Sequence, residues 1–255
     1  MEFDKVLKDH YLKGHQNFLR HLSVDNVIFG FHQNDLKVLL LKTKYAGIWS
    51  LSGGFILKDE TIDMAAQRVL KQRTGLEKIF LQQFHVFSDP ARSTKKMNQQ
   101  FMKNIGVRID DSWMYERFIS IGFYALVNFT KVNPKPDIFS EKCEWFSVKD
   151  VPEMILDHKQ IFDEALNSLR LQLSFHPIGY NLLEQKFTMP ELQKLYETIL
   201  DKKLDRRNFQ RKILATGILK KLEETKKGVA HKAPFYYKFD LRNYRKALVA
   251  GIGLF

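Results

Sequence analysis

The chain has 255 residues, 44% of them hydrophobic and 13% aromatic, which argues against disorder and suffices for one large folded domain or two smaller ones. We expect a cytoplasmic protein without a membrane partner, because no apolar run approaches the roughly 20 residues of a spanning helix, no apolar signal core opens the chain, and the lone Cys143 excludes an internal disulfide. The net charge of +12 is concentrated after residue 173, where 17 Lys and Arg face 8 Asp and Glu, which indicates either a polyanionic partner or a solvated basic surface.

The first half of the chain alternates strand and helix patterns. Residues 24–31 and 37–41 are apolar, β-branched runs on either side of the polar sequence His32-Gln33-Asn34-Asp35, which is the pattern of a β-hairpin. The spacing of apolar residues between Glu60 and Arg73 predicts a half-buried helix that ends before Gly75. Further strands are predicted at residues 47–54, 79–87, 118–127 and 144–148, and a second helix at residues 158–173.

Two irregular stretches interrupt this pattern. Residues 89–111 are polar and predict a long loop with a short helix inside it; loops of that length usually have a function or are disordered. His176-Pro177-Ile178-Gly179 breaks the helical periodicity and marks a domain boundary. We therefore predict an effector-sensing domain at residues 1–173 and a DNA-binding domain at residues 174–255.

The predicted helix carries a spaced set of residues that resembles the Nudix box. Gly54 is followed after five residues by Glu60, after seven more by Arg68, and then by Gly75 and Leu76. The resemblance covers roughly residues 20–173 and implies an α/β/α sandwich with a mixed sheet, in which helix glutamates bind magnesium and direct water at a nucleoside diphosphate. A chance strand–turn–helix is the alternative, and Arg68 can equally be a residue that only ties the helix to the glycine-rich turn.

The carboxylates that the box needs are absent from this chain. Magnesium takes oxygen ligands, and carboxylates at i, i+3 and i+4 share one face of a helix. The three positions hold Val69, Gln72 and Arg73, which are apolar, neutral and cationic, so Glu60 is left as a single carboxylate. We therefore expect no metal, no cofactor, no catalytic residues and no hydrolysis by the usual mechanism.

A Nudix domain without its metal site can still hold a small molecule. Aromatic faces suit a sugar and arginines suit a phosphate. Trp49 is also a typical packing residue, and the arginines can be solvated or paired. The predicted effector contacts are Lys42, Trp49, Gly53, Phe55, Glu60, Asp89, Arg92 and Arg117.

The C-terminal third has the pattern of a winged helix-turn-helix. Thr188 and Glu191 form a capping box before one helix, and Asp205 is a good N-cap for a second helix that ends near Ala215. Strands at residues 218–225 and 235–239 enclose a basic, glycine-containing loop, the pattern of a wing. A small helical subdomain with a solvated basic face is the alternative. The predicted DNA contacts are Lys203, Arg206, Arg207, Asn208, Gln210, Arg211, Lys212, Lys226, Lys227, His231 and Lys232.

The whole chain resembles the Nudix-related transcriptional regulators of the NrtR and AraR types. The resemblance rests on PIGYNLL, FTMPELQKLYETIL and DRRNFQRK, and the predicted fold class is α+β. It implies a homodimer on a palindromic double-stranded operator and a small-molecule effector in the Nudix domain. Members with a degenerate box control sugar-utilisation genes, so we expect a sugar or sugar phosphate ahead of ADP-ribose, the effector of the NAD-metabolism branch. The stretch between Arg92 and Trp113 departs from the family.

Two other functions are possible interpretations of the sequence. An active Nudix hydrolase with an appended nucleic-acid anchor would need an unusual metal site, since three carboxylates are missing. An RNA-binding module would need the exposed aromatic platform that single-stranded recognition uses, and the sequence offers none. A sequence-specific DNA-binding regulator is therefore the predicted function.

Overall fold

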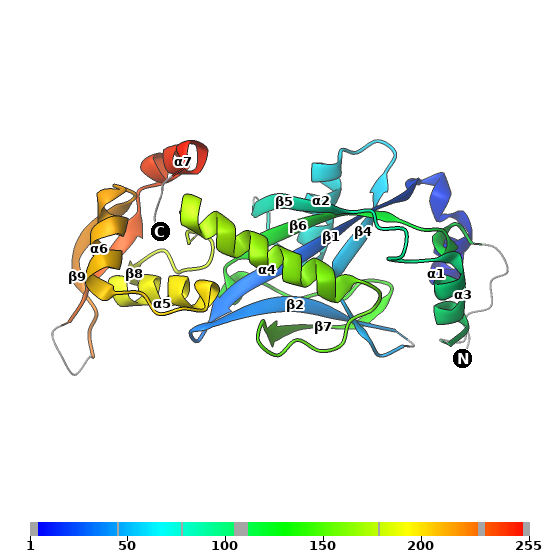
Figure 1. Ribbon diagram of the computed structural model, residues 1–255, viewed down its shortest axis with the longest axis horizontal. Helices are drawn as coiled ribbons and strands as arrows, with labels where there is room; N and C mark the ends of the chain where they lie inside the picture. Colours follow the sequence, from blue (N-terminus) through cyan, green and yellow to red (C-terminus); the bar gives the residue numbers. More distant parts are fainter. Residues whose placement is uncertain are drawn as a thin grey trace. The chain divides into compact units, whose positions relative to one another are not determined.

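The structure is a computed structural model that describes residues 5–44, 46–77, 79–104, 112–177, 179–228 and 233–251 (Figure 1). The chain divides into two compact units. The first comprises Met1–Phe29, Lys37–Ala125 and Lys131–Ala165, and the second Gly30–Leu36, Leu126–Thr130 and Leu166–Phe255. Within the described ranges, no helix is both long and apolar enough to cross a membrane.

The first unit is built on a seven-stranded sheet with strand order β3-β2-β1-β6-β5, to which β4 adds by pairing with β1 and β7 by pairing with β2. The β1–β4, β2–β3 and β2–β7 pairs are antiparallel. The strands are β1 (Phe18–His32), β2 (Asp35–Thr43), β3 (Trp49–Ser50), β4 (Ser52–Leu57), β5 (Phe80–Phe87), β6 (Ile119–Val127) and β7 (Ser140–Ser147).

Helices cover both faces of the central strand. Successive side chains of a strand point to opposite faces. Val24 of β1 packs in one apolar cluster with Val69 of α2 (Ile62–Thr74), whereas Phe29 meets Phe162 of α4 (His158–Phe175), with 6.3 Å between ring centroids. This explains the long apolar run in β1: a strand buried on both faces reads as continuous rather than alternating. The predicted α/β/α sandwich is confirmed.

The β1–β2 hairpin has the predicted turn. Gln33 and Asn34 both have positive φ, at 50° and 62°, so two left-handed residues connect the strands. Such turns match the twist of the flanking strands.

The first unit also has two short helices outside the sheet, one of them not predicted from the sequence and the other expected within residues 89–111. Helix α1 (Lys5–Lys13) leads into a 3₁₀ turn (Gly14–Gln16), and helix α3 (Lys95–Asn104) is the short helix expected within residues 89–111. A 3₁₀ turn (Trp113–Tyr115) follows. Tyr11, Met102 and Tyr115 form an apolar cluster that joins these three segments, and Trp113 Nε1 donates to the His10 carbonyl oxygen at 3.0 Å. The described parts of the stretch between Arg92 and Tyr115 are therefore packed against α1.

The described part of the second unit contains a three-stranded sheet of order β8-β10-β9, the helices α5, α6 and α7, and the C-terminal part of α4. Both capping signals are confirmed. Thr188 and Glu191 form the capping box of α5, and Asp205 Oδ1 accepts from the Asn208 N–H at 2.8 Å to cap α6, which spans the predicted residues. The elements are β8 (Phe187–Thr188), α5 (Met189–Leu200), α6 (Arg206–Ala215), β9 (Leu219–Thr225), β10 (Phe235–Phe239) and α7 (Leu241–Ala250).

The core of this unit fixes α5 against α6. Leu192, Leu195 and Ile199 are fully buried on α5, and the ring of Tyr196 lies 5.3 Å from that of Phe209 on α6. The predicted division between residues 173 and 174 falls inside α4, whose C-terminal part belongs to the second unit. The domain limits therefore remain a prediction.

Candidate functional site

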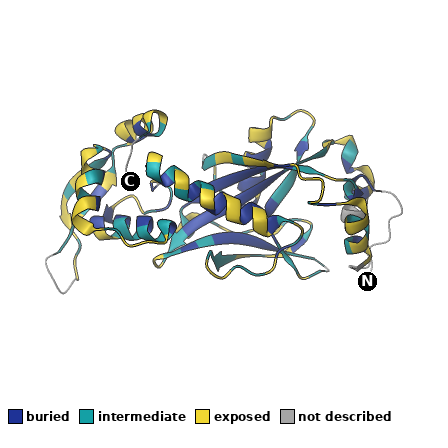
Figure 2. Ribbon diagram, in the orientation of Figure 1, coloured by how far each residue is buried: buried dark blue, intermediate teal, exposed yellow. Residues whose placement is uncertain are grey.

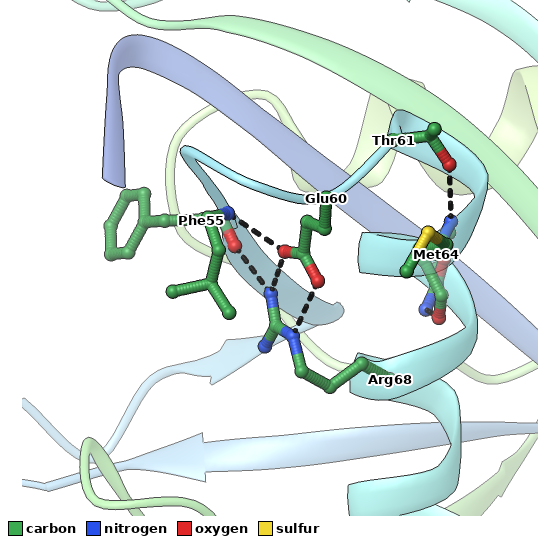
Figure 3. A network of polar contacts seen from close by, with 8 residues as sticks. Phe55, Glu60, Thr61, Met64 and Arg68 are labelled. Carbon is green, nitrogen blue, oxygen red and sulfur yellow. Dashed lines mark hydrogen bonds and ion pairs between the residues drawn. The ribbon is translucent and has the colours of Figure 1, made fainter. Parts of the chain in front are cut away.

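Glu60 and Arg68 form a clasp between the glycine-rich strand β4 and helix α2 (Figure 3). Arg68 donates from Nε to Glu60 Oε2 at 3.0 Å and from Nη2 to both Glu60 Oε1 at 2.5 Å and the Phe55 carbonyl oxygen at 2.7 Å. Glu60 Oε1 also accepts from the Leu57 N–H at 2.7 Å. These bonds, the Arg68 guanidinium first, lower the pKa of Glu60. Both residues therefore hold the turn in place, as the structural alternative for Arg68 predicted.

The helix face that would carry the metal carboxylates has a different use here. Val69 is buried in the apolar cluster beneath β4, and a Cβ added to Gly54 would lie 2.4 Å from its Cγ2. Gln72 is exposed at a cavity. In the described part of the chain, no three His, Cys, Asp or Glu side chains come together in a way that could hold a metal ion. These donor types do not fit a magnesium site.

At this end of the helix, Arg73 forms a buried ion pair with Asp137. Its Nη2 lies 3.0 Å from Asp137 Oδ2, and the side chains of the two residues are only 10% and 15% exposed. The loop that carries Asp137 is fixed to the helix end by backbone bonds, since Asn133 and Lys135 donate N–H groups to the carbonyl oxygens of Thr74 and Arg73. A guanidinium thus stands where a cation would otherwise be bound.

A cavity of about 1010 Å³ opens beside this pair, lined by β4, α1, α2, α3 and the loop around Asp137. Aromatic rings form much of its wall. Phe55 lies 5.6 Å from Phe18 and 5.4 Å from Phe118, ring centroid to centroid. The aromatic lining residues are His10, Tyr11, Phe18, Phe55, Phe101, Tyr115, Phe118 and Phe139. Planar rings bind on such walls.

His10 is part of this aromatic wall. Its ring centroid lies 5.0 Å from that of Phe139 and 5.4 Å from that of Phe55. Burial lowers the pKa of His10, and the charge of Asp137 opposes that shift. Among the described residues, no hydrogen-bond partner meets its Nε2. A buried polar atom without a partner is costly, so a ligand atom at this wall would relieve it.

The polar lining includes three residues that sequence reasoning missed. Asp25 is buried on β1, accepts a hydrogen bond from the Ser120 hydroxyl, and lies so close to Gly53 that a Cβ there would be 2.6 Å from its Oδ1. Lys44 and Lys135 line the cavity with no carboxylate paired to either among the described residues. No local sequence motif predicts that these three side chains share a site, because they come from β1, the end of β2 and a distant loop.

Three of the eight predicted effector contacts line the cavity: Gly53, Phe55 and Arg92. All three guanidinium nitrogens of Arg92 are engaged within the protein, which leaves one N–H on each of Nη1 and Nη2. Its Nε and Nη2 bind Asp157 at 2.7 and 3.0 Å, and its Nη1 donates to the Phe118 carbonyl oxygen at 2.7 Å. Arg92 therefore holds the cavity wall, and a phosphate contact by Arg92 remains a prediction without geometric support.

The other five predicted contacts are not part of the cavity lining, and each has a partner elsewhere. Lys42 pairs with Glu141, with 3.2 Å between nitrogen and oxygen, and Trp49 packs edge-on against Phe146. Glu60 belongs to the clasp, Asp89 caps the Ala91 N–H, and Arg117 donates to the Ser88 carbonyl oxygen. The packing alternative for Trp49 fits this geometry better than a ligand platform does.

Helix α6 presents a basic surface. Phe209 and Ile213 are buried, whereas Arg206, Arg207, Asn208 and Arg211 are exposed. Arg211 Nη2 donates to Asn208 Oδ1 at 2.8 Å, which aligns a guanidinium with an amide on the outer face. Gln210 and Lys212 are half-buried. Guanidinium and amide groups are the side chains that read guanine and adenine edges in the major groove.

The loop between β9 and β10 is described only in part. Lys226 pairs with Glu191, with 2.7 Å between Nζ and Oε1, and Lys227 is exposed. His231 and Lys232 lie outside the described residues. Lys203, at the turn before α6, is exposed and lies 3.9 Å from Glu197 Oε2. Because Lys226 is paired with Glu191 within the domain, it is a weaker candidate for a DNA contact than Lys227.

Comparison with known proteins places both halves of the chain. Residues 19–165 match the model of the NUDIX domain, and residues 179–239 match that of the NrtR DNA-binding winged helix domain. The chain is 26% identical over 231 residues to the ADPR responsive transcriptional repressor NtrR of Acinetobacter baylyi, which covers 88% of this chain and 83% of that protein. It is 26% identical over 166 residues to an ADP-ribose pyrophosphatase of Methanocaldococcus jannaschii, covering 64% and 83%.

Solved structures show the same arrangement of elements. NrtR of Shewanella oneidensis, complexed with a 27mer DNA, superposes with a TM-score of 0.71 at 21% identity and covers 89% of this chain and 96% of that one. A MutT/nudix family protein of Enterococcus faecalis superposes with a TM-score of 0.62 at 20% identity, covering 94% and 100%. At these identities the likeness shows the fold. The chain belongs to the Nudix family, and its Nudix domain is followed by a winged helix domain of the NrtR type.

Proposed function

We propose that this chain is a DNA-binding transcriptional repressor that senses a nucleoside diphosphate sugar, ADP-ribose first, in the cavity of its Nudix domain. A relative that matches most of the chain is a repressor named as responsive to ADPR. The observation that carries the proposal is the Arg73–Asp137 pair. It occupies the metal end of the Nudix helix, while the cavity beside it stays open.

The chemistry of the cavity suits a nucleoside diphosphate better than a free sugar. The aromatic wall offers faces on which a purine can stack, which a small sugar would leave largely unfilled. Lys44 and Lys135 are available for a pyrophosphate, and the Asp25 carboxylate can accept from ribose hydroxyls. The expectation of a sugar or sugar phosphate is therefore revised to ADP-ribose. A link to sugar-utilisation genes stays a prediction.

The winged helix would read DNA through α6. Arg207 and Arg211 lie one turn apart on its exposed face and would enter the major groove. Because two-fold symmetric dimers bind inverted repeats, we propose a homodimer on a palindromic operator. ADP-ribose binding would favour a state with lower DNA affinity, as in repressors that an effector releases.

Selection from a library of random duplexes, followed by anisotropy titrations, tests the proposal. An inverted repeat should be enriched, with binding that weakens steeply as salt rises. Adding ADP-ribose should weaken binding to the selected duplex by about 10-fold, whereas ribose or glucose should not. If no sequence is enriched, the proposal of a sequence-specific regulator is wrong. If ribose or glucose weakens DNA binding and ADP-ribose does not, ADP-ribose is not the effector.

The alternative of an active hydrolase has its own measurement. Incubation of ADP-ribose with the chain and magnesium should release no AMP above a buffer control, because one carboxylate cannot assemble the metal cluster. Turnover that disappears in Glu60→Gln but persists in Gln72→Ala would establish an enzyme and overturn the proposal of a pure sensor.

A further inference from the structure

Helix α7 carries a second basic surface beside the candidate recognition helix. It follows β10 and lies beyond residue 239, where the match to the winged helix model ends. Arg242, Arg245 and Lys246 are all exposed, and Val249 on the same side is 91% exposed. Tyr244 and Ala247 are the buried residues of this helix. The basic residues therefore take the face opposite the core, at i, i+3 and i+4 spacing.

Three contacts hold α7 at a fixed place in the second unit. The Tyr244 ring lies 5.2 Å from that of Phe239 and 5.6 Å from that of Tyr180. Asn243 Nδ2 donates at 3.0 Å to the carbonyl oxygen of Gly217, two residues after α6 ends. Figure 1 shows α7 (red) next to α6 (orange), and Figure 2 shows exposed residues along both helices. The two basic surfaces therefore lie in the same unit, and the Asn243–Gly217 bond links α7 to the chain just after α6.

The three cations of α7 destabilise this helix when no anion is bound. Arg242 stands in the first turn, where the helix dipole favours negative charge. Arg242 faces Arg245 at i+3 and Lys246 at i+4, and like charges at these spacings repel. The helix contains no acidic residue, and among the described residues no carboxylate pairs with these three cations. An anionic partner would remove this repulsion.

We infer that α7 is a second DNA-contacting element, whose Arg242, Arg245 and Lys246 bind backbone phosphates next to the site that α6 reads. The inference rests on the proposed DNA-binding function. Duplex DNA matches the surface because its phosphates are regularly spaced and follow the groove outward from a recognition helix. Phosphate contacts carry no sequence information, so α7 raises affinity for every duplex equally.

The salt dependence of binding separates α7 from α6. The triple variant Arg242→Gln, Arg245→Gln, Lys246→Gln is titrated by anisotropy against a labelled random duplex of about 30 base pairs and against the selected inverted repeat, between about 50 and 200 mM KCl. The slope of log K against log salt should fall by about 2 to 3, since each phosphate contact contributes about 0.9. Affinity for both duplexes should fall by the same factor, leaving their ratio unchanged.

A matched variant controls for net charge. Lys58→Gln, Lys96→Gln, Lys131→Gln removes three exposed charges from the first unit and should leave the slope within about 0.5 of wild type. If the α7 variant and the control change the slope of log K against log salt by the same amount, the inference about α7 is wrong, whereas the proposed DNA-binding function still stands. Absence of duplex binding by the wild-type chain at low salt overturns the proposed function and this inference together. Should the triple variant fail to fold, Arg245→Gln alone, with an expected slope change of about 0.9, decides between the same outcomes.

Discussion

Arg73 and Asp137 form a buried ion pair across 64 residues of chain, with 3.0 Å between Nη2 and Oδ2. The pair joins the last turn of α2 to the loop before β7. The guanidinium of Arg73 therefore occupies the C-terminal end of the Nudix helix. Two consequences follow for stability. A buried charge needs its partner, and the loop that closes the cavity depends on the helix end.

Removing the carboxylate of Asp137 should destabilise the chain strongly. Asp137→Asn keeps the acceptor for the Phe139 N–H but leaves the Arg73 guanidinium uncompensated, so we expect the free energy of unfolding to fall by about 3 to 5 kcal/mol. Urea unfolding followed by tryptophan fluorescence measures this. Asp163→Asn breaks the exposed pair with Lys159 and should cost no more than about 0.5 kcal/mol. Equal effects of the two changes would contradict a buried pair.

The close approach of Gly54 to Val69 predicts a non-additive pair of substitutions. A methyl group at residue 54 meets Val69 Cγ2 at 2.4 Å, so Gly54→Ala should cost about 1 to 3 kcal/mol through overpacking. Val69→Ala alone should also destabilise, by opening a small void. The double variant should be more stable than the sum of the two single effects allows. Additive losses in denaturant melts would mean that the two sites do not touch.

Glu60 should make stability depend on acid. Its pKa is held below the ordinary 4.5 by Arg68 and by the Leu57 N–H, so the unfolded chain binds its proton more readily than the folded chain. The stabilisation from the clasp is therefore fully present above about pH 4.5 and is lost as the pH falls through the lower, folded-state pKa. Unfolding free energies for wild type and Glu60→Gln should converge as the pH is lowered through this window. A constant difference would disprove the assignment.

We expect Lys44 and Lys135 to bind the pyrophosphate of the ligand and not its adenine. Lys44→Gln and Lys135→Gln should each weaken ADP-ribose binding by about 10-fold or more, the usual loss when a hydrogen bond to a charged group is removed. Adenosine, which lacks the pyrophosphate, should bind both variants and wild type alike. Isothermal titration calorimetry measures all six pairs. A matched loss for adenosine would show that these changes distort the cavity instead.

Sequence preference should depend on α6. Arg207→Ala with Arg211→Ala should reduce discrimination between the selected duplex and a scrambled one by about 10-fold or more, since one bidentate base contact contributes about 1 to 3 kcal/mol. The thermal unfolding midpoint should stay within about 2 °C of wild type, because both side chains are exposed. Undiminished discrimination would move base reading to another element.

Local signals predicted the elements best. The limits of α6 agree with the prediction of a helix from Arg206 to near Ala215, because Asp205 caps its first turn and Phe209 and Ile213 mark its buried side. Helix α7 was not predicted; in the structure it packs through Tyr244 against Phe239. Its local signals are the Asp240 N-cap and Gly251 at its C-terminal end, and its position in the unit depends on tertiary contacts.

The cavity could be predicted only in part, because its polar groups come together across long stretches of chain. Phe55 and Gly53 were found because they adjoin the glycine turn. For Arg92 the sequence left both a phosphate contact and an ion pair open, and its partner Asp157 lies 65 residues away in the chain. Asp25 and Lys135 have no neighbours in sequence that would signal a site, so only the fold reveals them.

Val69 makes the present state of the Nudix helix hard to reverse. Its side chain is 1% exposed among Val24, Ile56 and Phe123, directly beneath Gly54. A glutamate restored there would place an ionised group in that apolar layer, at a cost of several kcal/mol, before any second or third carboxylate could return to share a cation. A magnesium site on this face therefore conflicts with the apolar layer that fixes α2 beneath β4.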